Sequence, residues 1–221
     1  MKPVPKTLLY CIYNTEQKMM SYSQFSIQAI VKAFNLMMVE KTALFGDVAP
    51  LPCSAFLKET LDYNVPLALA SNTEKARSEM IISPILIELK KQLSTEISLF
   101  SGVEFNVDSE KGLIGFCDFI ISYSPEQLFI NVPVIMLVEA KNENIKNGLG
   151  QCIAEMLAAQ LFNQQEQNDI QEIYGVVTTG TIWQFLRLKD KTVEIDMNEY
   201  YLSELDKVLG ILSVSLNKGK V

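Results

Sequence analysis

The 221-residue sequence contains no histidine. This absence excludes Ser-His-Asp and Cys-His catalysis, zinc sites held by histidine, and nucleases that use a histidine base. A GxxxxGK[ST] phosphate-binding loop is also missing, and Gly148 and Gly150 lack the third glycine of a dinucleotide-binding motif. Any hydrolytic reaction would therefore have to use carboxylates, lysine and water, with or without a hard metal ion.

Cysteines are few and widely separated, and no CxxC pair occurs, which argues against a structural zinc site. Reduced thiols in a cytoplasmic protein are the simplest interpretation. No run approaches the ~20 apolar residues that span a bilayer, and the first residues show no small-residue cleavage site of a signal peptide. We therefore expect a cytoplasmic protein without a membrane segment.

Positive charge is also scarce, since the net charge is −7 and the sequence pI is about 4.8. Phosphate contacts normally come from clustered Lys and Arg, so this balance disfavours a polyanionic partner but leaves room for a local basic patch. The hydrophobic fraction of 48% is enough for one sizeable core.

The first part of the chain indicates helices. Residues 22–39 show helical spacing of apolar side chains, and three prolines between positions 50 and 66 then break the chain around one brief helix. We interpret residues 1–70 as a helical N-terminal elaboration and residues 71–221 as the main domain.

From residue 71 onwards the pattern is regular. Residues 71–93 predict a long amphipathic helix, bent near Pro84. The order that follows is three strands, a helix and a further strand, which predicts an α/β fold with a mixed β-sheet flanked by helices. The first three strands would form an antiparallel meander, and the fourth would join in parallel through the helix. The predicted strands are 99–107, 113–122, 132–141, 172–180, 181–189 and 192–196, and the predicted helices are 148–164 and 199–216.

Charged residues occur at the ends of two of these apolar strands. Side chains alternate across a strand, so Asp118 shares a face with apolar neighbours, as do Glu139 and Lys141. A charge on a face committed to burial is costly unless it is paired or bound to a cation. If the two strands are neighbours, the three side chains converge at one end of the sheet.

The predicted helices contribute two further polar candidates. Glu79 begins a core-facing stripe with steps of 3, 4, 3 and 4, whereas Glu88 falls among solvated charges. Gln151 falls in the first turn of the 148–164 helix and could project toward the strand ends. The stripe consists of Glu79, Ile82, Leu86, Leu89 and Leu93.

Asp118, followed after 21 positions by Glu139-Ala140-Lys141, resembles the motif of the PD-(D/E)XK nuclease superfamily. The helix before it, the helix after it and the following strand are similar to the core order of that superfamily, over roughly residues 74–180. The proline of the motif is replaced by Cys117, at a position that is commonly variable. The resemblance implies a restriction-endonuclease-like core of αβββαβ order, with a helical N-terminal extension and a C-terminal helix.

The resemblance also implies a Mg²⁺ site, with Mn²⁺ as an alternative ion. Asp118, Glu139 and the Ala140 carbonyl would ligate the ion, and Glu79 would ligate directly, through water or at a second ion. Lys141 would orient or activate the attacking water and offset charge on the phosphate. Gln151 would position the lysine or the substrate backbone. Without metal, crowded carboxylates should raise at least one pKa.

The expected activity is metal-dependent phosphodiester hydrolysis by a nuclease, with DNA favoured over RNA. A homodimer would suit two-strand cutting, which needs two sites. Two other functions remain open: a catalytically silent nuclease-fold protein that acts as an interaction module, which the acidic charge favours, and a metal-dependent hydrolase of small phosphoesters. An interpretation without a functional site is that Glu139 and Lys141 form a solvated strand end and that Asp118 caps a turn.

Overall fold

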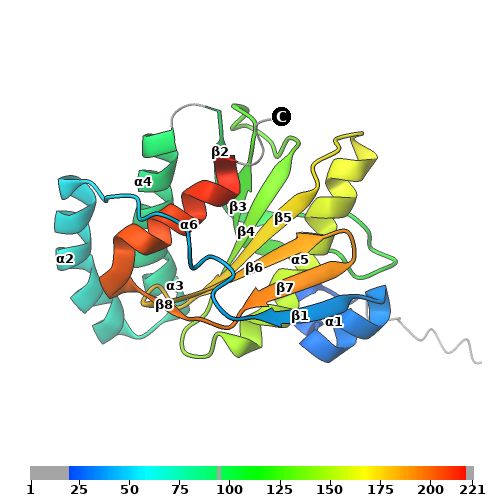
Figure 1. The fold of residues 1–221 in the computed structure, drawn as a ribbon, viewed down its shortest axis with the longest axis horizontal. Coiled ribbons are helices and arrows are strands. Elements are labelled where there is room, and N and C mark those ends of the chain that lie inside the picture. The colour runs from blue at the N-terminus through cyan, green and yellow to red at the C-terminus, as the bar shows by residue number, and fades with distance from the viewer. Residues whose placement is uncertain (1–19, 94–95, 218–221) are drawn as a thin grey trace, which may run out of the picture.

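The computed structural model describes residues 20–93 and 96–217 and has an open, mixed eight-stranded sheet with helices on both faces (Figure 1). The strands are β1 (Met37–Lys41), β2 (Ser98–Glu104), β3 (Phe116–Ser122), β4 (Val134–Ala140), β5 (Glu172–Thr178), β6 (Ile182–Lys189), β7 (Thr192–Asp196) and β8 (Tyr200–Tyr201). The α-helices are α1 (Ile27–Phe34), α2 (Ala55–Ser71), α3 (Glu74–Arg77), α4 (Ser83–Leu93), α5 (Lys146–Gln165) and α6 (Leu205–Asn217). Short helical turns are η1 (Tyr22–Gln24), η2 (Ser78–Ile82) and η3 (Leu202–Glu204).

The strand order is β1-β7-β6-β5-β4-β3-β2, and β8 pairs with β6. β2, β3 and β4 form an antiparallel meander, and β5 returns parallel to β4 after α5. The predicted α/β class, the meander and the parallel crossover are therefore confirmed. All seven residues of β4 are buried, because this strand lies inside the sheet and is covered on both faces.

Two hydrophobic cores lie on opposite faces of the sheet. One packs the sheet against α2, α4 and α6, and the other packs it against α1 and α5. In Figure 1, α6 crosses the face that also carries α2 and α4. Along β4, Val138 belongs to the first core and Leu137 to the second. Alternation therefore directs Glu139 toward the α5 side.

The N-terminal region differs from the predicted helical elaboration. The helix expected at 22–39 ends at Phe34, because Asn35 adopts a left-handed conformation with φ of 52°. The chain then forms β1, which pairs in parallel with β7. Residues 20–70 thus contribute a strand and core side chains to the same sheet as the remainder of the chain. At the other end, β8 and η3 precede α6 where one continuous helix was predicted.

The helix expected at 71–93 contains a π-helical turn, η2, just before Pro84. Pro84 has no N–H to offer the Met80 carbonyl four residues earlier, and the Asn64 Nδ2 donates to that oxygen at 3.0 Å. The wider turn changes the helix phase. Glu79 consequently lies outside the core: its side chain is 60% exposed and pairs with Lys75 at 2.7 Å. The prediction that Glu79 belongs to the core-facing stripe is wrong.

Glu88 is the reverse case, since it is buried rather than solvated. Its carboxylate accepts hydrogen bonds from the backbone N and the Oγ of Ser54 at 2.9 and 3.0 Å, at the residue that caps α2. Glu88 therefore joins α2 to α4. Among the described residues, no helix is long and apolar enough to cross a membrane.

Candidate functional site

Asp118 and Glu139 lie at neighbouring positions on β3 and β4. Residue pairing between these strands begins at Phe119 and Val138, and continuing that register by one residue sets Asp118 opposite Glu139. At this point the Asp118 Oδ2 accepts a hydrogen bond from the Ala140 backbone N at 2.8 Å. The carboxylate of Asp118 is thus held between the two strands, beside the end of β4.

Glu139 is buried, with 1% of its side chain exposed, and its Oε1 forms an ion pair with the Lys141 Nζ. Its Oε2 is buried and has no hydrogen-bond partner among the described residues. Burial raises the pKa of Glu139 to about 8, and the charge of Asp118 adds to this effect while Lys141 opposes it. The expected rise in one carboxyl pKa is therefore present, with desolvation as its main cause.

Lys141 lies on the same side of β4 as Glu139 and follows the strand end. Burial lowers the pKa of Lys141, but the charge and hydrogen bond of Glu139 outweigh burial and the net pKa is raised. The amine is therefore protonated at neutral pH. In this arrangement the Lys141 ammonium is a positive charge held beside Glu139.

Gly148 makes room for the Lys141 side chain. A Cβ on Gly148 would lie 2.7 Å from the Val177 Cγ1 and 3.0 Å from the Lys141 Cγ. Gly150 serves a different contact, since its Cβ would lie 2.2 Å from the Phe25 carbonyl oxygen. Both glycines lie inside α5, which begins at Lys146, two residues before the predicted start of this helix.

Glu155, which was not predicted from the sequence, lies beside Glu139. It lies on α5, is fully buried, and its Oε1 accepts a hydrogen bond from the Gln151 Nε2 at 3.0 Å. Its Oε2 is buried and has no hydrogen-bond partner in the part of the chain that the structure describes. Burial raises the pKa of Glu155 well above its usual range, and the charge of Glu139 raises it further. The sequence signal was an acid within the apolar run CIAEMLAA.

The structure thus brings Asp118, Glu139, Lys141 and the Ala140 backbone together, whereas the exposed Glu79 pairs with Lys75. Gln151 reaches this group through Glu155. From the helix that was expected to supply Glu79, Glu74 in the first turn of α3 is close enough for its charge to raise the pKa of Glu139.

The donor types fit a hard divalent cation. Mg²⁺ is commonly held by one or two carboxylates, with water and substrate phosphate completing its octahedron. Asp118 and Glu139 supply two such carboxylates, and the unpartnered Oε2 of Glu139 has the chemistry of a ligand atom. In residues 20–93 and 96–217, no three His, Cys, Asp or Glu side chains form a cluster arranged to hold an ion by themselves.

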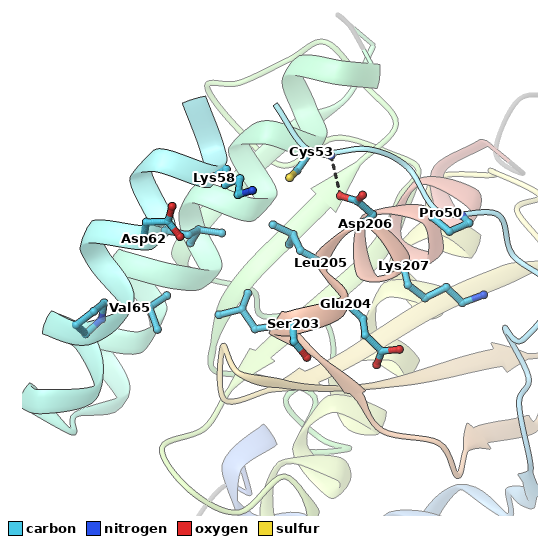
Figure 2. Close-up of a pocket in the computed structure, with 13 residues that line it drawn as sticks. Pro50, Cys53, Lys58, Asp62, Val65, Ser203, Glu204, Leu205, Asp206 and Lys207 are labelled. Atoms are coloured by element: carbon cyan, nitrogen blue, oxygen red, sulfur yellow. Dashed lines mark hydrogen bonds between the residues drawn. The ribbon is translucent and has the colours of Figure 1, made fainter. Parts of the chain in front are cut away.

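A separate groove of about 830 Å³ lies between α2 and the start of α6 (Figure 2). Apolar side chains such as Leu61 and Leu205 line it, together with charged residues of both signs. At one edge the Asp206 Oδ1 accepts a hydrogen bond from the Cys53 backbone N at 2.9 Å, drawn as the dashed line in Figure 2. Asp118, Glu139 and Lys141 do not line this groove. Its charged residues are Lys58, Asp62, Glu204, Asp206 and Lys207.

Comparisons with protein-family models and with curated proteins find no match to this chain. The side chains at the ends of β3 and β4 and their partners on α5 are therefore the features of the molecule that bear on its function.

Proposed function

We propose that the protein is a Mg²⁺-dependent phosphodiesterase of the PD-(D/E)XK type that cleaves DNA. The observation that carries this proposal is the convergence of Asp118 and Glu139 from adjacent strands, with Lys141 paired to Glu139. The Oε2 of Glu139 is buried and has no hydrogen-bond partner among the described residues. This supports a cation at this position.

The element order supports the same assignment. The helical segment α3–α4 precedes the β2–β3–β4 meander, and α5 then leads to β5. This order matches the αβββαβ order expected of a restriction-endonuclease-like core, in which Asp118 would lie on the second core strand and Glu139 and Lys141 at the end of the third. Beyond the elements of this core, the sheet continues past β5 with strands β6, β7 and β1, and β8 pairs with β6.

Each residue has a defined task in this proposal. Mg²⁺ would polarise the scissile phosphate and lower the pKa of a bound water. The Ala140 N–H orients Asp118, so that its carboxylate faces Glu139 across the strand ends. Lys141, protonated because of Glu139, donates hydrogen bonds to the attacking water and offsets charge on the phosphate. Gln151 orients Glu155, which packs beside Glu139.

Cleavage of a labelled DNA by purified protein in Mg²⁺ tests the proposal. Asp118→Ala, Glu139→Ala and Lys141→Ala should each abolish cleavage while the circular dichroism spectrum is retained. Glu79→Ala is the matched control: it removes an exposed acid outside the site and should leave the rate unchanged. Cleavage that survives all three site substitutions would remove the assignment.

The net charge of −7 favours a second candidate, a nuclease-fold protein that binds a partner without catalysis. Calorimetric titration with Mg²⁺ or Mn²⁺ separates the two. Binding that is lost in Asp118→Asn supports the enzyme, whereas no binding at millimolar ion supports the silent protein. Turnover of nucleotides without cleavage of polynucleotides would instead indicate a small-phosphoester hydrolase.

A further inference from the structure

Arg77, the last residue of α3, is a partly buried guanidinium held by three neutral oxygens. Its Nε donates to the Asn142 Oδ1 at 3.1 Å, and its Nη1 donates to the Thr179 carbonyl oxygen at 3.1 Å. A longer contact of 3.4 Å joins its Nη2 to the Asn72 Oδ1. The side chain is therefore fixed in place by three different connecting segments.

These contacts hold Arg77 at the same end of the sheet as the carboxylates. Asn142 directly follows Lys141 in the chain. Thr179 directly follows Thr178, whose carbonyl oxygen accepts a hydrogen bond from the Lys141 backbone N at 2.8 Å. Arg77 is thus hydrogen-bonded to the segment that follows β4 and to the segment that follows β5.

The charge of Arg77 is not neutralised by an acid. Within residues 20–93 and 96–217 no carboxylate forms an ion pair with it, whereas Arg187, the other arginine of the chain, pairs with Glu194 and Glu172. A guanidinium has five N–H donors. Three of those on Arg77 are engaged, so one on Nη1 and one on Nη2 have no acceptor within the described ranges.

A phosphodiester needs such a cation here. In the proposed function Mg²⁺ and Lys141 serve the scissile phosphate, so a neighbouring phosphate would approach this acidic end of the sheet, Glu74 included, without a cation of its own. A guanidinium that is held rigidly and lacks a carboxylate partner binds phosphate oxygens with little loss of conformational entropy. Neutral partners keep Arg77 in position without reducing its charge.

We propose that Arg77 binds a backbone phosphate of the nucleic-acid substrate next to the phosphate at Lys141. The two remaining N–H groups of Arg77 donate to two oxygens of that phosphate. This inference rests on the proposed nuclease function, and it identifies a residue that would hold the backbone of the substrate strand in place. It is a positioning contact that contributes binding energy, and it takes no part in bond cleavage.

The alternative is a purely structural role, in which Arg77 only ties three connecting segments together. Arg77→Gln and Lys75→Gln distinguish the two, because both remove one positive charge from the same helix. Lys75 is exposed and pairs with Glu79. Steady-state cleavage of a labelled DNA oligonucleotide in Mg²⁺, at several salt concentrations, gives KM, kcat and the salt slope for each variant.

Arg77→Gln should raise KM about tenfold and keep kcat within about threefold. The slope of log(kcat/KM) against log[salt] should become shallower by the amount expected for the loss of about one phosphate contact. Lys75→Gln should match the wild type in all three quantities. Arg77→Lys keeps the positive charge but loses the planar guanidinium that donates two hydrogen bonds to one phosphate. Its KM should therefore lie between those of the wild type and Arg77→Gln, and its salt slope should be close to that of the wild type.

Equal KM and salt slope in Arg77→Gln and Lys75→Gln would overturn the proposal, whatever the change in Tm. If Arg77→Gln does not fold, the decision passes to Arg77→Lys, and a wild-type KM in that variant overturns it. If the wild type cleaves no DNA, the nuclease function fails separately. Fluorescence anisotropy of the same oligonucleotide without metal then decides: weaker binding by Arg77→Gln than by Lys75→Gln supports the phosphate contact, and equal binding removes it.

Discussion

The carboxyl groups of Glu139 and Glu155 lie side by side at the end of β4, and each has one buried oxygen that receives no hydrogen bond from the described residues. Two ionised carboxylates cannot hydrogen-bond to each other, so the contact requires either a proton on one of them or a cation beside them. A purely structural pair would be expected to satisfy its oxygens. This arrangement therefore supports a functional role for this end of the sheet.

The substitution Glu155→Gln should stabilise the protein in the absence of divalent ions. The introduced amide keeps the shape of the side chain, removes one acid, and can donate a hydrogen bond to the Glu139 Oε2. We expect the free energy of unfolding at pH 8 to rise by about 1–2 kcal/mol, measured by urea denaturation. Glu166→Gln changes an exposed acid at the end of the same helix and should have little effect. A loss of stability in Glu155→Gln would contradict this account of the pair.

The metal-free protein should lose stability as the pH rises from about 5 to about 8. Burial raises the pKa of Glu139 from its usual 4.5 to about 8, so the folded state binds more protons than the unfolded state between these values. Stability is then greatest below the lower value and declines as the pH rises through the higher one. At about 1.4 kcal/mol per pH unit, the Glu139 contribution has a ceiling of about 5 kcal/mol. Denaturation at several pH values should show a flatter profile for Glu139→Gln, and an unchanged profile would rule out Glu139 as the source.

The apparent affinity for Mg²⁺ should increase with pH over the same window. A cation at the Glu139 Oε2 competes with the proton that the raised pKa places there, so each binding event releases a proton below about pH 8. Calorimetric titrations in two buffers of different ionisation enthalpy would measure this release. Affinity that is constant between pH 6 and pH 8 would show that the ion does not bind at Glu139.

The sequence predicted the central strands well because their signals are local. Runs of apolar and β-branched residues bounded by Gly, Pro and Asn located β3 to β7 to within a few residues. β1 was missed because its partner, β7, lies about 150 residues further along the chain. A short sequence such as MMVEK at residues 37–41 carries no sign of that distant partner.

Site residues followed the same rule. The two-residue period of strands predicted that Asp118, Glu139 and Lys141 converge at one end of the sheet, and the pairing of β3 with β4 brings them together there. Glu79 was misplaced because the π-helical turn at Ser78–Ile82 breaks the 3.6-residue period on which the stripe depended. Glu155 escaped notice because most of α5 is buried, so the helix has no clear polar face from which an inward acid would stand out.

The close approach of α5 to β4 makes Gly148 a test of the Lys141 position. In Gly148→Ala the added Cβ would meet the Val177 Cγ1 at 2.7 Å and the stem of Lys141 at 3.0 Å, so the valine must move and the lysine stem must shift by a few tenths of an ångström. Because Ala favours helix by about 1 kcal/mol over Gly, part of the steric cost is offset. We expect a stability loss of about 1–2 kcal/mol and a fall in kcat of at least about tenfold, since misplacement by about 1 Å can cost a hundredfold in rate.

Gly150→Ala is the matched comparison, since its Cβ would meet the Phe25 carbonyl oxygen at 2.2 Å and its three nearest neighbours are all backbone atoms of residues 25–27. This variant should lose more stability than Gly148→Ala, because rigid backbone rather than a side chain must give way. Its kcat, measured well below its Tm, should fall less. If Gly150→Ala reduces kcat more than Gly148→Ala at equal folded fraction, the room that Gly148 leaves for Lys141 is not what sets the rate.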